Sequence, residues 1–221
     1  EMSASLVGSE MCIRDRNMSS QIEYIQRVGN FGADMYHLDV MDGKFVKNKS
    51  IDQTYVEQLR EKSALLFDVH LMIENADKVV KKYINAGANI ISVQFEAFSD
   101  EKVLIKTLKT IKNSGVMAGI AIDIDTDVNK IEPIIKYVDM VLVLCVKVGK
   151  GGQDFNKNAI KKIKTLRSQY PDLLIEADGG INDKSAPSVV RAGADILVSG
   201  HYIYTNDAYE AIQTLKGKNG Q

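Results

Sequence analysis

A histidine and a carboxylate stand two residues apart at the end of an apolar run, in the segment His37-Leu38-Asp39-Val40-Met41-Asp42-Gly43. In a strand, residues i and i+2 project from the same face. A strand here would therefore present one imidazole and one carboxylate side by side. Both groups bind divalent cations, so the spacing predicts two ligands of a metal site, His37 and Asp39, at the end of a strand.

Two later apolar runs end in the same chemistry, at His70 and at Asp178. Either residue alone is equally well explained as a satisfied polar side chain at a strand end. Taken together with His37 and Asp39, they predict a site with two imidazoles and two carboxylates, which suits Zn²⁺, Mn²⁺, Fe²⁺ or Co²⁺. Asp39 and Asp178 come from distant strands and would face each other. Two opposed carboxylates suit a two-base proton transfer at a carbon beside a carbonyl.

Glycine-rich turns follow the last three predicted strands. Such turns let backbone N–H groups approach a phosphate closely. A single turn of this kind is most simply explained by turn geometry, but three in succession favour a phosphate site. The candidate phosphate-binding residues are Gly149, Gly151, Gly152, Gln153, Gly179, Gly180, Gly200 and His201.

Met41 and Met72 each follow a predicted ligand, Asp39 and His70, by two residues. They would share a strand face with these ligands. One interpretation is ordinary core filling, which is common for methionine. The alternative is an apolar cap that keeps water away from a reaction intermediate.

Strand-like and helix-like segments alternate along the chain. The strands are short and rich in Val, Ile and Leu, as in parallel strands that are buried on both faces. Seven βα units follow a first helix at 21–28, and an eighth strand before it would complete a (β/α)₈ TIM barrel; an open doubly wound sheet is the alternative. We expect strands at 35–40, 65–72, 90–95, 116–122, 140–146, 173–177 and 196–199, and further helices at 51–62, 76–86, 101–112, 128–136, 158–169, 186–191 and 208–215.

The N-terminal segment is the atypical part of this pattern. The charged residues Glu10, Arg14, Asp15 and Arg16 would be costly in a barrel wall. Either a truncated strand lies at 4–7 or foreign sequence has replaced the native first strand, and the run 6–16 resembles a translated cloning remnant. We expect one barrel domain over residues 1–221, with residues 1–16 foreign.

Composition narrows the class of protein. The chain has 221 residues, 45% of them apolar, and a formal net charge of −1, which favours a single globular domain and disfavours a nucleic-acid partner. Two cysteines fit a reducing cytosol. No apolar run reaches the length of a membrane span, and no secretory start is present. We therefore expect a cytoplasmic protein without a membrane partner.

The chain resembles the ribulose-phosphate 3-epimerase family from about residue 21 to its end. This resemblance implies a TIM-barrel enzyme that inverts carbon 3 of a ketose phosphate, D-ribulose 5-phosphate to D-xylulose 5-phosphate, through an enediolate. It also implies that His37, Asp39, His70 and Asp178 bind the metal and that Asp39 and Asp178 are the acid/base pair. The motifs that carry the resemblance are His37–Val46 with Asn48, Asp68–Met72, Gly149–Phe155, Glu176–Ile181 and Ala192–Asp195.

The chain departs from the family pattern at several positions. Gln94 stands where the family usually has histidine, Lys147 opens a loop that usually begins with asparagine, and His201 replaces a common serine. Leu144 stands for a third methionine of the apolar cap, and the usual first-strand serine motif is only faintly present.

Three alternatives remain open. Allulose-6-phosphate 3-epimerases share the motifs and act on a hexulose phosphate. Barrels such as the hexulose-phosphate synthase group use lyase chemistry that depends on a lysine, which the motif 37–42 lacks. A non-catalytic sugar-phosphate-binding protein is the third alternative. The sequence leaves the oligomeric state open, a homo-oligomer included.

Overall fold

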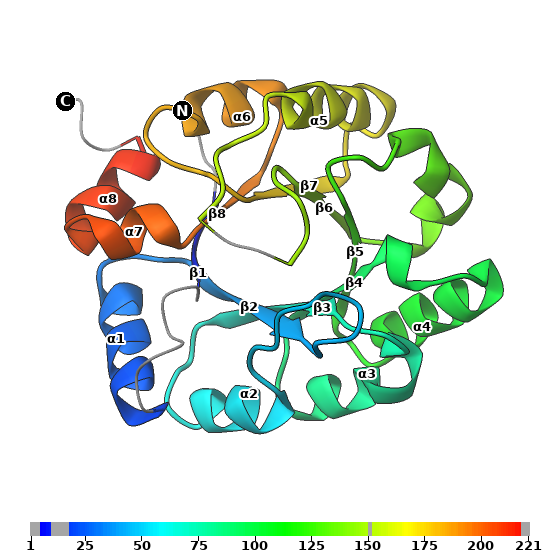
Figure 1. Cartoon of the computed structure of the whole chain (residues 1–221), viewed down its shortest axis with the longest axis horizontal. Helices are drawn as coiled ribbons and strands as arrows, with labels where there is room; N and C mark the ends of the chain where they lie inside the picture. The colour runs from blue at the N-terminus through cyan, green and yellow to red at the C-terminus, as the bar shows by residue number, and fades with distance from the viewer. Residues whose placement is uncertain (1–4, 10–17, 150–151, 218–221) are drawn as a thin grey trace.

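Eight parallel strands close into a barrel, in sequence order around its wall, in the computed structural model (Figure 1). The structure describes residues 5–9, 18–149 and 152–217. The predicted (β/α)₈ fold is confirmed, and the open doubly wound sheet is wrong because β1 pairs with both β2 and β8. The strands are β1 Ser5–Ser9, β2 Met35–Met41, β3 Leu66–Met72, β4 Ile90–Gln94, β5 Met117–Ile122, β6 Met140–Leu144, β7 Leu174–Asp178 and β8 Ile196–Ser199.

Helices form a ring outside the strands (Figure 1). Every predicted helical segment is helical, within a few residues at its ends. The helices are α1 Met18–Asn30, α2 Gln53–Arg60, α3 Ala76–Asn85, η1 Phe95–Ala97, α4 Glu101–Asn113, η2 Val128–Tyr137, α5 Asn158–Gln169, α6 Ala186–Ala192, α7 His201–Thr205 and α8 Ala208–Leu215.

Three helical segments differ from the expected pattern. The segment η2 is a 3₁₀ helix with Pro133 inside it, and proline removes one backbone donor and disfavours a regular α-helix. The short helices η1 and α7 were not predicted, because three and five residues are too few to show an apolar period.

Local sequence explains where several elements begin and end. The Asp52 side chain accepts hydrogen bonds from the backbone N–H groups of Thr54 and Tyr55 at the start of α2. Gly193 ends α6 in the left-handed region at φ 111°, which glycine adopts without the steric cost of a Cβ. These boundaries fix how each helix returns the chain to the next strand.

The first strand occupies Ser5–Ser9. It overlaps the truncated strand expected at 4–7 and extends it through Gly8 and Ser9, where strand was not expected. Its register places Val7 beside both Met35 of β2 and Val198 of β8. The charged residues Glu10, Arg14, Asp15 and Arg16 lie outside the described residues.

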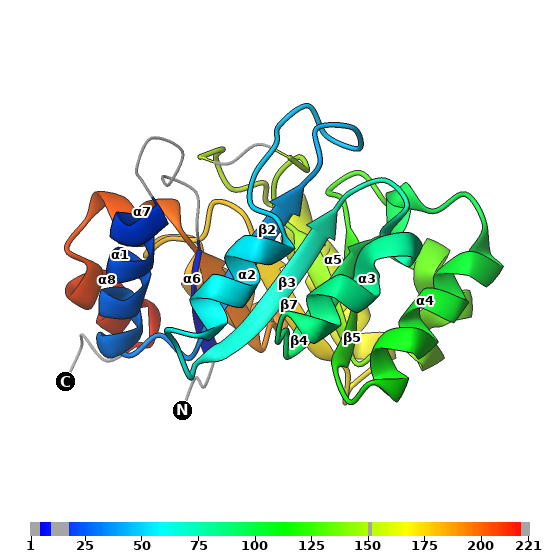
Figure 2. The same ribbon diagram turned by 90° about the horizontal axis from the view of Figure 1, so that it is seen from below.

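The barrel interior is layered along its axis. At the N-terminal end, side chains from four strands form an apolar floor, which consists of Met35, Ile90, Met140, Ile196 and Val198. Two residues further along β2 and β3 the interior becomes polar, at His37 and Asp68, which are both fully buried. The loops after β2 and β6 rise together beyond the C-terminal ends of the strands (Figure 2). The polar residues of the next layer are therefore presented toward these loops.

Candidate active site

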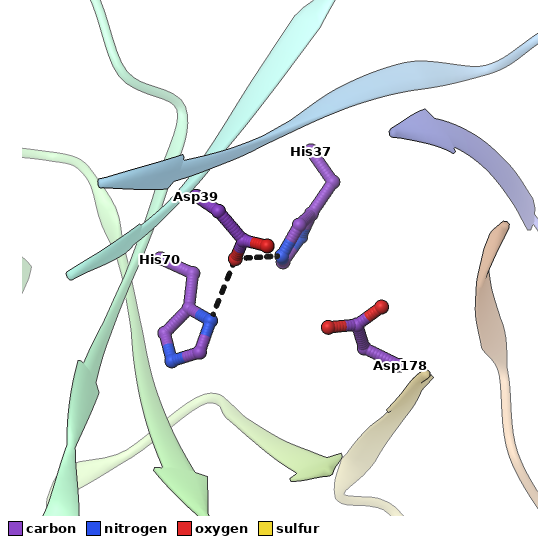
Figure 3. Close-up of side chains that lie close together, drawn as sticks. All are labelled: His37, Asp39, His70 and Asp178. Carbon is purple, nitrogen blue, oxygen red and sulfur yellow. Dashed lines mark hydrogen bonds and ion pairs between the residues drawn. The ribbon is translucent and has the colours of Figure 1, made fainter. Parts of the chain in front are cut away.

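Two imidazoles and two carboxylates converge at the C-terminal end of the barrel (Figure 3). His37 and Asp39 come from β2, His70 from β3 and Asp178 from β7. One ligand atom from each residue lies within 4.8 Å of all the others. His37 Nε2 is 3.1 Å and His70 Nδ1 3.0 Å from the same oxygen, Asp39 Oδ1. The structure thus brings together all four residues that the strand-end pattern singled out.

The donor set fits a borderline divalent cation. His37 and His70 are completely buried, and the exposed fraction of Asp39 is 7%. Each imidazole is also held from behind, His37 Nδ1 by Asp68 and His70 Nε2 by the side-chain oxygen of Gln94 at 2.7 Å. Such outer contacts fix the ring that binds a metal in many proteins. They leave His37 Nε2 and His70 Nδ1 facing the common centre.

Two buried acids below the site were not predicted as functional residues. Asp68 contacts His37, and Glu176 Oε1 lies 3.6 Å from His37 Nδ1. Each stands two residues before a predicted ligand, so the same strand alternation would have found them. Burial, followed by the nearby charge of Asp68, raises the pKa of Glu176 well above its ordinary range. Burial therefore favours the neutral form of this acid.

Two opposing effects act on the pKa of His37. Burial disfavours its charged form, but the negative charge of Asp68 and hydrogen bonds to the surrounding carboxylates raise its pKa well above the ordinary value. The imidazole is thus stabilised by acids on both sides, Asp39 in front and Asp68 behind. In the metal-free protein this arrangement holds the ring in place for a cation.

The pKa values of the two facing carboxylates are shifted in opposite directions. Burial opposes ionisation of Asp39, but hydrogen bonds from His37 and His70 outweigh it and lower the pKa of Asp39. Burial and then the charge of Asp39 raise the pKa of Asp178 to about 6. One carboxylate is thus readily ionised and the other readily protonated, which is the difference that a proton donor and a proton acceptor need.

A cavity of about 230 Å³ opens beside the four ligands. Its wall includes Asp39 and Asp178 together with the predicted phosphate-binding residues, except for Gly151, which lies outside the described residues. The predicted residues in the wall are Gly149, Gly152, Gln153, Gly179, Gly180, Gly200 and His201. Asn182, Tyr202 and Thr205 also line it, and no pattern in the sequence pointed to them.

The glycine turns allow the loops around this cavity to pack closely. Gly180 has a φ of 67°, and a Cβ on it would lie 2.5 Å from the backbone nitrogen of Phe155. Gly179 has a φ of 107°, and a Cβ there would lie 2.4 Å from a methyl group of Val146. The loop after β7 therefore needs glycine at both positions to lie against the loop after β6.

The three predicted cap residues border the same cavity. Met41, Met72 and Leu144 line it, and Met41 and Met72 pack with Val46 in a separate small apolar cluster. All three predicted residues are buried. They form an apolar side of the cavity next to the ligands, and Val148, beside the Gly149 turn, packs against the cluster of Met41, Met72 and Val46.

The loops after β2 and β6 contact each other over the cavity. The side-chain amide of Asn48 donates a hydrogen bond to the carbonyl of Gly149. Lys147 forms ion pairs with Asp123 at 2.9 Å and Asp125 at 2.5 Å, and its side chain remains more than half exposed. Gln153, a predicted phosphate residue, donates its amide to the carbonyl of Lys147. These contacts brace the loop after β6; Lys150 lies outside the described residues.

Comparison with known proteins gives consistent results. The profile of the ribulose-phosphate 3 epimerase family matches residues 10–204. The ribulose-phosphate 3-epimerase of Bacillus subtilis (strain 168) is 41% identical over 199 residues, which are 87% of this chain and 90% of that protein. The ribulose-phosphate 3-epimerase of Aquifex aeolicus (strain VF5) is 40% identical over 201 residues, 89% of each chain.

Solved structures of similar shape are more distant in sequence. A 3-hexulose-6-phosphate synthase superposes with a TM-score of 0.73 at 15% identity, over 96% of this chain and 98% of that one. The 3-keto-L-gulonate-6-phosphate decarboxylase of Vibrio cholerae superposes with a TM-score of 0.76 at 11% identity, over 98% and 97% of the two chains. At such identities the likeness supports the barrel fold alone. Within the described part of the chain, no helix has the length and apolar character needed to cross a membrane.

Proposed function

Because the chain belongs to the ribulose-phosphate 3-epimerase family, we propose that it is an isomerase that interconverts D-ribulose 5-phosphate and D-xylulose 5-phosphate by inverting carbon 3. The observation that carries this proposal is the convergence of His37, Asp39, His70 and Asp178 beside a cavity with glycine turns in its wall. A non-catalytic binding protein would not need two facing carboxylates whose pKa values are shifted in opposite directions. Isomerase activity is also what family membership implies.

The two carboxylates are the proposed catalytic residues. Asp39, the readily ionised member, takes the proton from carbon 3 on one face of the sugar, and Asp178 delivers a proton to the same carbon from the opposite face. The electron pair of the broken C–H bond moves onto the neighbouring carbonyl oxygen and returns when the second proton arrives. Asp39 then releases its proton to solvent and Asp178 takes one up, which restores both residues for the next turnover. In the reverse direction the two residues exchange roles.

A divalent cation, Zn²⁺, Mn²⁺, Fe²⁺ or Co²⁺, held by His37, Asp39, His70 and Asp178 would supply positive charge that stabilises the enediolate. The glycine turns and His201 hold the phosphate through backbone N–H groups and the imidazole, with Gly149, Gly151, Gly152, Gln153, Gly179, Gly180 and Gly200 as the proposed contacts. Met41, Met72 and Leu144 exclude water from the reacting carbon, which protects the intermediate.

Deuterium exchange tests the proposed reaction. The purified protein is incubated in D₂O with ribulose 5-phosphate and, separately, with allulose 6-phosphate, and deuterium at carbon 3 is followed by NMR. We expect rapid incorporation with the pentulose phosphate. Faster exchange with the hexulose phosphate would assign the enzyme to the allulose-6-phosphate epimerases, and no exchange with either sugar would refute the reaction.

Single carboxamide variants test the two-base assignment. Asp39→Asn and Asp178→Asn should each slow carbon-3 exchange by about 10²–10⁴-fold, the usual contribution of a positioned acid or base. Asp172→Asn makes the same chemical change at an exposed position just before β7 and should leave the rate unchanged. Metal content is measured for each variant, because both carboxylates are also proposed ligands. Exchange at the wild-type rate in either active-site variant contradicts the mechanism.

The remaining proposals concern the whole chain. We propose a single barrel domain over residues 1–221, a cytoplasmic location and a homo-oligomer as the state to test by light scattering. We also propose that residues 1–16 are foreign, since the charged residues between Glu10 and Arg16 are atypical of a barrel strand, although the family profile already matches from residue 10. Sequencing the source DNA across codons 1–16 tests the last point, and an uninterrupted native reading frame would refute it.

A further inference from the structure

Gln94 and Glu96 connect one proposed metal ligand to the loop after β5. Gln94 is the last residue of β4 and is completely buried. Its side-chain oxygen lies 2.7 Å from His70 Nε2, and its side-chain nitrogen donates to Glu96 Oε2 at 2.6 Å. Glu96 is exposed and lies in η1, directly after the strand. A buried amide thus joins a buried imidazole to a carboxylate at the surface.

The carboxylate fixes the orientation of the amide. A carboxylate group only accepts hydrogen bonds, whereas an amide has one accepting and one donating end. Both oxygens of Glu96 are engaged, Oε2 by Gln94 and Oε1 by the backbone N–H of Asp123 at 2.9 Å and the hydroxyl of Thr126. The nitrogen of Gln94 must therefore face Glu96, and its oxygen must face His70.

The orientation of the amide in turn fixes the proton on His70. Because the Gln94 oxygen accepts a hydrogen bond, His70 Nε2 must carry a hydrogen. In the structure the other ring nitrogen, Nδ1, lies 3.0 Å from Asp39 Oδ1 and donates a hydrogen bond to it. When a cation takes the common centre, Nδ1 is therefore the ring nitrogen that gives up its hydrogen and offers a lone pair, while Nε2–H stays on Gln94. The ring nitrogen that carries the proton is set by the partner of the opposite nitrogen, as in other metal-binding histidines.

We propose that Glu96 and Gln94 are positioning residues that hold His70 in its Nε2–H tautomer and so keep Nδ1 available as a metal ligand. This inference rests on the metal site of the proposed function. His37 is held differently, because a carboxylate, Asp68, contacts its ring directly. The two ligand histidines therefore present opposite nitrogens, Nε2 and Nδ1, to the same centre.

Substitution of Glu96 tests the relay. Glu96→Gln supplies an amide that donates as well as accepts, so Gln94 is free to turn its nitrogen toward His70 and favour the wrong tautomer. We expect the dissociation constant for Zn²⁺, measured by chelator competition, to rise about 10–100-fold, the usual effect of losing an outer-shell partner. Gln94→Met removes the acceptor at similar volume and should give a similar loss.

An exchange of the two groups should restore binding. In the double variant Gln94→Glu/Glu96→Gln, the carboxylate at position 94 accepts from His70 Nε2–H and from the new amide at position 96. We expect a zinc affinity at least equal to that of the wild type. Thr126→Val is the matched control, since it removes a contact of Glu96 without touching Gln94; its affinity should remain at the wild-type value.

Nitrogen-15 NMR of labelled imidazoles reads the tautomer directly. The chain has only three histidines, His37, His70 and His201, and His201 is exposed, so it serves as an internal reference. We expect a solvent-protected Nε2–H of His70 in the wild type, with and without zinc. This resonance should be lost in Glu96→Gln and regained in the double variant. A merely structural role of Glu96 would lower stability without moving the tautomer.

The outcomes separate this inference from the proposed function. Wild-type zinc affinity and an unchanged His70 resonance in Glu96→Gln would overturn the relay, as would equal loss in Thr126→Val or failure of the double variant to recover. The metal-free spectrum tests the relay even in a protein that binds no zinc. A wild-type protein with the expected tautomer but without carbon-3 exchange would refute the epimerase and leave the relay standing.

Discussion

The floor and the mouth lie at opposite ends of one barrel and differ in chemistry, although β2 contributes to both. On β2 the inward positions are Met35, His37, Asp39 and Met41, at every second residue. Met35 joins the apolar floor, His37 and Asp39 belong to the ligand set, and Met41 borders the cavity. The inward positions of this one strand therefore pass from an apolar floor residue through two ligands to an apolar residue beside the cavity.

Buried polar atoms lower the stability of the layers above the floor, whereas the floor has no such atoms. A buried polar group without a partner costs free energy, and several such atoms belong to inward strand positions near the ligands. They include Asp68 Oδ1, Ser92 Oγ and both side-chain oxygens of Glu176. The floor contains only apolar side chains. The comparison indicates that the floor stabilises the fold. In the layers above it, the cost of unpartnered polar atoms offsets part of the stabilisation that burial provides.

Removal of the metal should affect the mouth most strongly and the floor hardly at all. Dialysis against a chelator should lower epimerase activity by about a thousandfold or more, since charge stabilisation by a metal contributes several kcal/mol to the barrier. Readdition of Zn²⁺, Mn²⁺, Fe²⁺ or Co²⁺, one at a time, should restore it and identify the preferred ion. The far-ultraviolet circular dichroism spectrum should not change. Full activity after verified metal removal would contradict the proposed role of the site.

A cavity in the floor should have the opposite effect. Met140 is completely buried among the floor residues, and truncation of a buried methionine to alanine typically costs about 2–5 kcal/mol of unfolding free energy. We expect Met140→Ala to lose stability in urea by this amount while its zinc affinity stays within about twofold of the wild type. A parallel loss of zinc affinity would show that floor and mouth are not separable.

The stability of the layer that contains Asp178 should depend on pH, whereas that of the apolar floor should not. In the metal-free protein the pKa of Asp178 is raised from 3.8 to about 6, by burial and then by the charge of Asp39. The folded state therefore holds this proton more tightly than the unfolded state. Its stabilising effect is complete below pH 3.8 and is lost as the pH rises through 6, by about 3 kcal/mol.

Urea unfolding with chelator present, from pH 4 to pH 8, measures this loss. The difference in unfolding free energy between wild type and Asp178→Asn should change across this interval, because the variant carries no proton there. Met140→Ala should instead lose the same amount at every pH, since no ionisable group is altered. A wild-type curve parallel to that of Asp178→Asn would show that the pKa of this carboxyl is not raised.

The alternation of residues along the strands was enough to predict the ligands, but not the side chains that hold the ligand histidines in place. His37, Asp39, His70 and Asp178 stand out because polar residues are unusual at the ends of buried strands. Contacts such as Gln94 with His70 join residues of two neighbouring strands, and they depend on the register between those strands. Gln94 was noticed only as a departure from a family pattern, and its contact with His70 was not predicted.

Contacts between loops were even harder to predict from the sequence. The motif His37–Val46 with Asn48 was singled out, but its contact with Gly149 crosses 101 positions of sequence. The 3₁₀ helix η2 shows the same difficulty at short range, because its apolar period alone also suits an α-helix. Spacing along the chain therefore predicted which layer a strand residue occupies, whereas side-chain contacts between elements required the folded geometry.

The hydrogen bond between Asn48 and Gly149 should contribute least, because it joins two loops above the mouth and reaches neither layer. Its loss in Asn48→Ala removes one partly buried hydrogen bond, which contributes about 1 kcal/mol. If the bond holds the two loops over the bound sugar, the KM for ribulose 5-phosphate should rise about fivefold, the same energy expressed as binding, while kcat stays near the wild-type value. Lys47→Gln alters an exposed neighbour and should change neither constant. A fall in kcat with unchanged KM would instead place Asn48 among the groups that act on the reacting carbon, and the separation between the bracing loops and the chemistry of the mouth would have to be abandoned.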